Sequence, residues 1–405
     1  SALVIGSFLR KDHPLFAQRL RQAARKGSAI HRLHALDDDW AMPLATHLGA
    51  APSAWPQALA DVAAAVAAQK GIAAPLPGTA HDAATVIAAS LLGAERKGLL
   101  LGNAAAQHPQ ASVLLALAQW IAQHTGASVG YLGEAANSVG AQLVGALPGA
   151  GGLNAGQMLS QGMKALLLLN VEPELDAANP PGARAALQRS GLVVALTAFK
   201  DAMVENADVL LPIAPFTETA GSFISAEGRL QAFTGVVPPL GETRPAWKVL
   251  RVLGNLLGLS DFQQDNAEQV RTEAIGDPSA LAARLDNRAA ALPASLATSA
   301  GGCERIADVP IYAADALVRR AESLQLTADA RAPVASLPSA LWAELGLKAG
   351  EAVRLSMQGQ QAEHVLLIAA VEDPSLAPGV VRVPAGHADT AVLGAMFGAV
   401  NVTRV

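Results

Sequence analysis

Short apolar runs alternate with longer amphipathic stretches through the first two-thirds of the chain. Apolar runs typical of strands lie at residues 3–5, 29–33, 98–101, 127–131, 164–170, 192–196 and 209–211. Helical spacing of apolar positions occurs at residues 14–26, 53–69, 81–92, 111–125 and 182–190. Strands that alternate with helices favour parallel sheets. We therefore predict two doubly wound, mainly parallel α/β units, residues 1–131 and residues 132–259.

Beyond residue 259 the pattern changes. Residues 260–331 are rich in Asp, Gln, Arg, Ala and Ser and contain only short helical pieces, which is typical of a connecting segment. After them, short β-like runs at residues 352–357, 363–370 and 380–383 are divided by Gly and Pro. The tail, residues 332–405, is therefore predicted to form a small β-barrel-like unit.

The amino-acid composition excludes several classes of protein. Hydrophobic residues make up 51% of the 405 residues and charged residues 16%, which excludes disorder for the chain as a whole. The 29 basic and 34 acidic residues give a net charge of −5, so the basic footprint of a nucleic-acid-binding protein is missing. No apolar run approaches the ~18 residues of a membrane-spanning helix, which predicts no direct membrane insertion. The chain starts with Ser-Ala-Leu and not with Met, so we expect a piece of a longer protein.

Residues 98–163 contain a single formally charged side chain, Glu134. So charge-poor a stretch fits either a buried junction between the two α/β units or a glycine-rich lining for a ligand or partner. We expect it at the junction, with the loop of residues 137–152 near residues 6–9 and 170–173. Its apolar side chains Leu143, Val144 and Leu147 are then predicted to pack inward.

Signatures of metal and nucleotide chemistry are weak. No P-loop or HExxH motif occurs, and no GxGxxG follows a predicted strand. His31 and His34 lie on opposite faces of a predicted strand, which disfavours a shared metal, and the Asp run after them is expected to be a solvated helix entry. The single cysteine, Cys303, excludes an intramolecular disulfide, a CxxC zinc site and a cysteine-ligated cluster within this chain, and we expect it as a free thiol in a polar linker. We therefore predict no bound metal and no catalytic residue.

Residues 207–231 carry most of the candidate chemistry. A buried strand is expected to end at Pro212, because proline cannot donate to a continuing ladder. Glu218, Glu227 and Arg229 follow in a glycine-bearing segment. The prediction is a structural loop in which these side chains form at least one charge-assisted hydrogen bond, partly buried against the strand.

This segment resembles the molybdopterin oxidoreductase superfamily, whose members carry an ADVVLP strand followed by E..GT..N.EGR.Q. The matching positions are Ala207, Asp208, Val209, Leu211, Pro212, Glu218, Gly221, Glu227, Gly228, Arg229 and Gln231. Further matching positions are Gly6, Ser7, His13, Pro14, Asn137, Gly140, Gly145 and Pro148, and the tail resembles the family's terminal barrel. The resemblance implies the formate dehydrogenase-like fold and a cofactor cleft. Its candidate residues here are Gly6, Ser7, His13, Asn137, Gly140, Asn170, Pro173, Glu218, Glu227 and Arg229.

Within the superfamily the chain resembles the C-terminal portion of the G subunit of bacterial NADH-quinone oxidoreductase, respiratory complex I. The similar phrases lie at residues 7–25, 170–176, 220–233 and 238–253. The resemblance implies that electrons pass from NADH toward quinone through iron–sulfur clusters held in an N-terminal region outside this chain. It also implies other hydrophilic-arm subunits as partners, and a peripheral position on the cytoplasmic side of the inner membrane.

Three departures from the molybdoenzyme pattern change the expected chemistry. The apolar Phe8-Leu9 replaces a compact polar turn, Leu143 stands where an acid is usual, and Glu172 brings a carboxylate to a loop that a pyrophosphate would approach. A carboxylate repels a phosphate and supplies no donor to it. We therefore expect a vestigial cleft without molybdopterin in a scaffold segment. The alternative is a fragment of a formate dehydrogenase-like enzyme that binds a molybdopterin dinucleotide.

Overall fold

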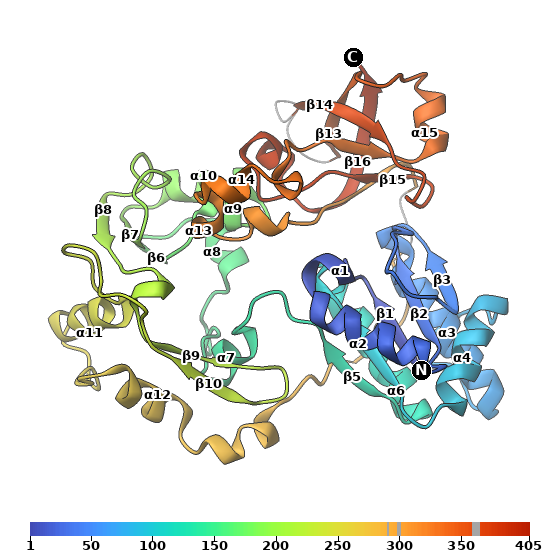
Figure 1. Ribbon diagram of the computed structural model, residues 1–405, viewed down its shortest axis with the longest axis horizontal. Helices are drawn as coiled ribbons and strands as arrows, with labels where there is room; N and C mark the ends of the chain where they lie inside the picture. Colours follow the sequence, from blue (N-terminus) through green and yellow to red (C-terminus); the bar gives the residue numbers. More distant parts are fainter. Residues whose placement is uncertain (290, 298–300, 359–364) are drawn as a thin grey trace. The chain divides into compact units, whose positions relative to one another are not determined.

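The computed structural model describes residues 1–289, 291–297, 301–358 and 365–405. The chain forms two compact units. Unit 1 comprises Ser1–Glu134, Asn287–Ala314 and Ala321–Val405, and unit 2 comprises Ala135–Asp286 and Asp315–Arg320. Elements of both units are labelled in Figure 1.

Unit 1 contains a five-stranded parallel sheet in the order β3-β2-β1-β4-β5. Its strands are β1 (Ala2–Ile5), β2 (Ile30–His34), β3 (Thr46–Gly49), β4 (Gly98–Leu101) and β5 (Ser128–Tyr131). Its helices are α1 (Leu9–Asp12), α2 (Pro14–Arg25), α3 (Trp55–Lys70), α4 (Asp82–Gly93), α5 (Asn103–Ala106) and α6 (Ala111–Thr125). The parallel sheet confirms the predicted fold class, and β3 is a strand that the apolar pattern did not predict.

Both faces of this sheet are covered, as a parallel sheet requires. Side chains of β1 alternate between the faces. Leu3 and Ile5 pack into a core with α3, α4 and α6. Ala2 and Val4 pack on the other side with Ala17 and Leu20 of α2.

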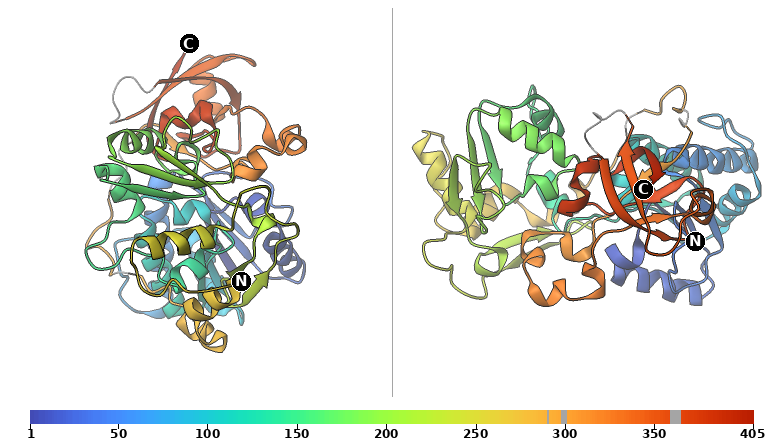
Figure 2. Two further views of the ribbon diagram at one scale, coloured as in Figure 1. Left: turned by 90° about the vertical axis from the view of Figure 1, so that its left-hand side faces the viewer. Right: turned by 90° about the horizontal axis from the view of Figure 1, so that it is seen from above.

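The remainder of unit 1 is a closed barrel of six strands in the order β11-β15-β12-β14-β13-β16, drawn in orange and red in Figure 2. The strands are β11 (Glu304–Ile306), β12 (Ala335–Leu337), β13 (Ala352–Met357), β14 (Val365–Glu372), β15 (Val380–Arg382) and β16 (Phe397–Arg404). Short helices α14 (Glu322–Gln325) and α15 (Ser339–Glu344) lie between strands in the chain. The barrel confirms the predicted β tail. Residues 363 and 364, where we expected the second run to begin, lie outside the described residues.

Two predictions about residues 260–331 need correction. β11 lies in the expected connecting segment, yet it pairs with β15 and β16 and completes the barrel. Cys303, immediately before β11, is not in a polar linker, because it packs partly buried against the barrel core. A strand of three residues leaves little sequence pattern, and its partners are more than seventy residues away in the chain.

Unit 2 contains a three-stranded parallel sheet and an antiparallel hairpin. The sheet strands, in chain order, are β6 (Leu166–Leu169), β7 (Val193–Thr197) and β8 (Val209–Pro212), and the hairpin strands are β9 (Gly221–Ile224) and β10 (Leu230–Phe233). The helices are α7 (Ser138–Leu143), α8 (Ala155–Gln161), α9 (Pro173–Asp176), α10 (Pro180–Arg189), α11 (Ala246–Leu256), α12 (Ala267–Ile275) and α13 (Ala316–Arg319). None of the described helices is long and apolar enough to cross a membrane.

The charge-poor stretch, residues 98–163, is largely buried where it belongs to unit 1 and partly exposed where it belongs to unit 2. In unit 1 it supplies β4 and the buried apolar face of α6, as its composition predicts. In unit 2 the prediction of inward packing is wrong for Val144 and Leu147, which are 44% and 61% exposed. Leu143 alone packs against the cluster of Ile224, Ile275 and Leu281. The short helix α7 can present only one side to that small cluster, so the residues after it remain exposed.

Candidate functional site

The order of strands in unit 1 reverses between β1 and β4, because β2 and β3 lie on one side and β5 on the other. Ligands of open α/β sheets bind at the carboxyl ends of the strands at such a reversal. The turn after β1 passes through Gly6, whose φ of +56° is left-handed. A Cβ there would lie 2.6 Å from the backbone nitrogen of Ala105. The turn thus holds the segments after β1 and β4 close together.

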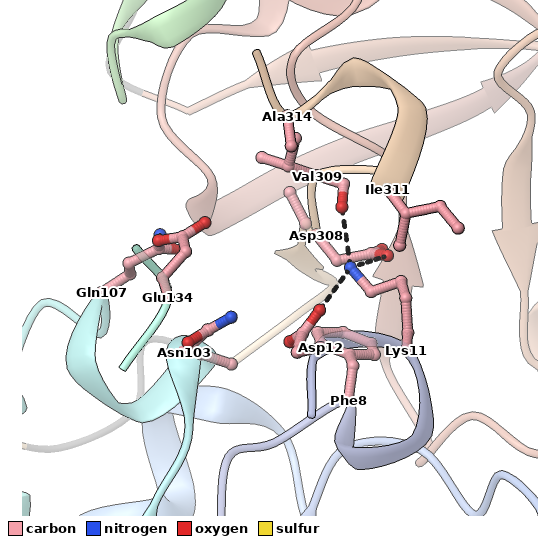
Figure 3. Close-up of a pocket in the computed structure, with 12 residues that line it drawn as sticks. Phe8, Lys11, Asp12, Asn103, Gln107, Glu134, Asp308, Val309, Ile311 and Ala314 are labelled. Atoms are coloured by element: carbon pink, nitrogen blue, oxygen red, sulfur yellow. Dashed lines mark hydrogen bonds and ion pairs between the residues drawn. The ribbon is translucent and has the colours of Figure 1, made fainter. Parts of the chain in front are cut away.

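A cavity of about 170 Å³ lies at this reversal, and we call it the β1–β4 cavity. Phe8 lines it, although the side chain is itself buried. The polar and charged lining side chains are Lys11, Asp12, Asn103, Gln107, Glu134 and Asp308, shown in Figure 3. They come from the segments after β1, β4, β5 and β11, and sequence analysis singled out none of these six for this site.

A buried charge network forms one wall of the β1–β4 cavity. Lys11 Nζ lies 3.0 Å from Asp12 Oδ1 and 3.1 Å from Asp308 Oδ2, and it donates to the carbonyl of Val309 at 2.7 Å. Arg382 donates to both carboxylate oxygens of Asp308 at 2.8 and 3.0 Å. Burial opposes ionisation of Asp308, but Lys11 and Arg382 outweigh it and hold the pKa of this carboxyl well below its ordinary value. Asp308 is therefore a fixed anion that two cations neutralise.

The opposite wall of the β1–β4 cavity carries the carboxylate of Glu134, whose hydrogen-bond donor is a neutral side chain. Gln107 Nε2 donates to the carboxylate of Glu134, the one charge of the charge-poor stretch. Partial desolvation of Glu134, and then the nearby charge of Asp12, raise the pKa of Glu134. Asn103 is buried, and its Oδ1 has no hydrogen-bond partner within the part of the chain that the structure describes. An unpaired buried amide is unusual and needs an explanation.

Several of the predicted site residues have structural roles. Ser7 is buried, and its hydroxyl has no hydrogen-bond partner in the described ranges, whereas the imidazole Nε2 of His13 lies 2.8 Å from the carbonyl of Gly133. In unit 2, Asn137 Oδ1 accepts the amide of Ile224 at 2.9 Å and Asn137 Nδ2 donates to the carbonyl of Ser222 at 3.2 Å. Its side chain therefore caps the edge of β9. Gly140 leaves the space for this cap, because a Cβ there would lie 2.1 Å from Asn137 Oδ1.

The carboxyl ends of β6 and β7 carry a second charge cluster. Asn170, after β6, has φ of +51°, and Pro173 begins α9. Between them Glu172 is only 4% exposed, and its carboxylate lies 2.8 Å from Arg319 and 2.6 Å from Arg320. Arg319 also contacts Asp176, Arg320 also pairs with Asp201 at 2.9 Å, and the Arg320 guanidinium lies 4.5 Å from the ring centroid of Phe199. We call this set the Glu172 clamp.

The Glu172 clamp depends on a short segment, Asp315–Arg320, that belongs to unit 2 although its neighbours in the chain belong to unit 1. Sequence analysis identified Glu172 but not Arg319 and Arg320, which fall in the predicted connecting segment. The paired basic residues Arg319-Arg320 were the available signal. Their position in the sequence does not indicate which carboxylate, more than a hundred residues away, they pair with.

The loop of Glu218, Glu227 and Arg229 needs a correction. Glu218 Oε2 accepts the amide of Leu240 at 2.9 Å, which is a charge-assisted hydrogen bond as predicted, but it is exposed and not partly buried. Arg229 and Glu227 are exposed, and within the described residues neither side chain has a hydrogen-bond or ion-pair partner. The turn is held instead by Ser225, whose hydroxyl accepts the amides of Glu227 and Arg229. The predicted stabilising role of Arg229 is therefore wrong.

His31 and His34 are both completely buried in β2. Burial lowers the pKa of His31 to about 4, and burial together with the charge of Arg32 lowers the pKa of His34 to about 3. The Asp run after them begins no helix, because Asp37 and Asp38 pair with the buried Arg32. No group of three or more His, Cys, Asp or Glu side chains in the described ranges is arranged to hold a metal.

Comparison with known proteins identifies the family. The molybdopterin oxidoreductase family matches residues 2–256, which is more than half of the chain. The chain belongs to the molybdopterin oxidoreductase family. The solved structure of acetylene hydratase from Pelobacter acetylenicus has the same fold, with a TM-score of 0.70 at 12% identity over 100% of this chain and 78% of that one.

Two curated proteins show similarity in sequence. The G subunit of the NADH-quinone oxidoreductase of Mycobacterium bovis is 32% identical over 223 residues, which cover 52% of this chain and 26% of the relative. A Staphylococcus aureus (strain USA300) protein named "Putative formate dehydrogenase" is 30% identical over 90 residues, 22% of this chain and 9% of the relative. The chain therefore spans about a quarter of the length of the first relative.

The family takes its name from a molybdopterin cofactor, and the phosphates of such a group need free cationic side chains, backbone amides or helix N-termini. In the β1–β4 cavity Asp12, Glu134 and Asp308 face two cations that are already paired. In the Glu172 clamp three carboxylates again face two paired cations. Both clusters keep a net negative charge. Neither cluster therefore offers a free cation to a pyrophosphate-bearing cofactor, and no reaction step is assigned to one.

Proposed function

We propose that this segment is a cofactor-free structural part of the G subunit of NADH-quinone oxidoreductase. It supports electron transfer from NADH toward quinone without carrying electrons. The similarity to that subunit over about half of the chain supports the assignment to this complex. The Glu172 clamp is the single observation that carries the cofactor-free part of the proposal. Its two arginines, which could otherwise bind a phosphate, are neutralised by carboxylates of the same unit.

The proposal places the chemistry outside this chain. One cysteine cannot ligate an iron–sulfur cluster, so the clusters belong to the N-terminal part of the G subunit and to neighbouring subunits. The partners are the other hydrophilic-arm subunits, and the segment sits peripherally on the cytoplasmic side of the inner membrane. Exposed apolar residues of unit 2, such as Val236 and Leu240, are available for contacts within such an assembly.

Two measurements test the proposal. Purified protein, produced in cells that also make a molybdopterin enzyme as a positive control, should contain neither stoichiometric molybdenum nor pterin by elemental analysis and by fluorescence after oxidation. Stoichiometric pterin would instead establish the formate dehydrogenase-like alternative. In the native host, the tagged protein should co-purify with the NADH-oxidising subunits from solubilised membranes. An untagged strain is the control, and recovery of the tagged protein without those subunits would refute the assignment to the complex.

A further inference from the structure

We infer that the β1–β4 cavity binds a small organic cation, an ammonium or guanidinium head group. The inference rests on the unused hydrogen-bonding capacity of its walls, which is acceptor capacity apart from the amide nitrogen of Asn103. It goes beyond the proposed function, because a structural segment has no need of a ligand.

Lys11, the cation in the cavity wall, is already paired and is not available to bind an anionic ligand. An ammonium group has three hydrogen-bond donors. Lys11 directs them at Asp12, Asp308 and the carbonyl of Val309, all within 3.1 Å. Arg382, behind Asp308, is committed to both oxygens of that carboxylate. Lys11 therefore has no donor left for an entering phosphate or carboxylate, and Arg382 is not among the residues that line the cavity.

The carboxylates of Asp12 and Glu134, in contrast, can accept further hydrogen bonds. An ionised carboxylate offers about four lone-pair sites. Asp12 meets one cation through one oxygen, and among the described residues Glu134 accepts a hydrogen bond only from the neutral amide of Gln107. Desolvation, and then the nearby charge of Asp12, raise the pKa of Glu134. A cation between Asp12 and Glu134 would supply a nearby positive charge.

Asn103 is an independent sign of a ligand. Its side chain lines the cavity between these two acids, as Figure 3 shows. It is 9% exposed, and its Oδ1 has no partner among the described residues. Leaving a buried polar atom unpaired costs about 1–3 kcal/mol, so such atoms normally meet a partner or a ligand. Figure 3 shows the amide nitrogen of Asn103 on the cavity side, so this side chain offers an acceptor oxygen only when a donor in the cavity reverses the amide.

Size and ligand chemistry favour an organic head group over a metal ion or a nucleotide. A cavity of about 170 Å³ is several times larger than a single water molecule needs. That space accepts a guanidinium or a propylammonium, whereas a dinucleotide is far too large. Among the residues that the structure describes, no group of three or more His, Cys, Asp or Glu side chains is placed to hold a metal ion. The head group could belong to a free metabolite or to a Lys or Arg side chain of a partner protein.

The test is calorimetric titration of the purified chain with methylguanidinium and with n-propylammonium, at constant ionic strength. We expect saturable binding of at least one of them and none of acetate or phosphate. Glu134→Gln keeps the shape and removes the charge, so affinity should fall roughly tenfold or more, and Asn103→Ala should also weaken binding. Glu95→Gln, an exposed acid of the same unit, is the matched control and should bind as the parent does.

Acetyl-arginine-amide, which carries peptide bonds on both sides of the side chain, separates the two sources. Binding at least as tight as that of methylguanidinium supports a partner's side chain, whereas binding of the bare head groups alone supports a free metabolite. The inference is overturned if neither head group binds, if phosphate binds in their place, or if Glu134→Gln binds as the parent does. Glu134 is exposed, so this variant should fold and leave the outcome decisive even if Asn103→Ala does not.

Discussion

Acid should weaken unit 1 through two buried histidines. His31 and His34 are fully buried, and their pKa values in the folded chain are about 4 and about 3 because burial disfavours the imidazolium. An unfolded chain binds these protons with an ordinary pKa of about 6.5. Each histidine is therefore neutral in the folded chain and charged in the unfolded chain when the pH falls below 6.5. The stability that they contribute is complete above that pH and is lost as the pH decreases.

The size of the effect follows from proton linkage. Between pH 7 and pH 5 each histidine should cost about 2 kcal/mol of unfolding free energy, or about 4 kcal/mol together. That is a large share of the roughly 5–15 kcal/mol that stabilises a domain. Burial raises the pKa of Asp38, and partial desolvation raises that of Glu134, so protonation of these acids offsets part of the loss at lower pH. The comparison is therefore best made between pH 7 and pH 5.

The assay is urea unfolding followed by tryptophan fluorescence, which reports unit 1 through the buried Trp40 and Trp55. His31→Leu removes one titrating group whose two ring nitrogens have no partner. It should keep its stability at pH 7 and lose only about half as much as the parent at pH 5. His81→Asn replaces an exposed helix-capping histidine by another capping residue and should keep the parent's full acid dependence. Equal stability of the parent at pH 7 and pH 5, or an unchanged slope in His31→Leu, would refute the argument.

Three further substitutions test the structure. Arg319→Ala leaves Glu172 buried with one cation fewer, so the unfolding free energy of unit 2, measured by urea unfolding with circular dichroism, should fall by about 3–5 kcal/mol. A change below about 1 kcal/mol would contradict the Glu172 clamp. Arg229→Ala, with no partner to lose, should melt within about a degree of the parent, and a large drop would reveal a contact of Arg229 that the structure lacks. Gly102→Ala would place a Cβ 2.6 Å from the Gly6 carbonyl oxygen, so it should destabilise unit 1 by about 1–3 kcal/mol, whereas Gly93→Ala, with open space, should not.

The sequence by itself determined the local elements and the family. Strands such as β1 and β4 and helices such as α3 and α6 follow from apolar periodicity, which reflects contacts made within a few residues. β3 was missed because Thr46–Gly49 is short and partly polar, and β11 because only its barrel partners make it a strand. The local pattern of apolar residues gives no information about pairing with strands so far away in the chain.

Only the tertiary structure decided which charges meet. Glu172 was identifiable from its loop, but its partners Arg319 and Arg320 approach from the predicted connecting segment. Arg229 matched the family motif, yet it remains exposed, while the unremarked Lys11, Asn103 and Asp308 meet in the β1–β4 cavity. An ion pair or a cavity depends on distances between side chains far apart in the chain. The sequence specifies those distances only through the complete fold.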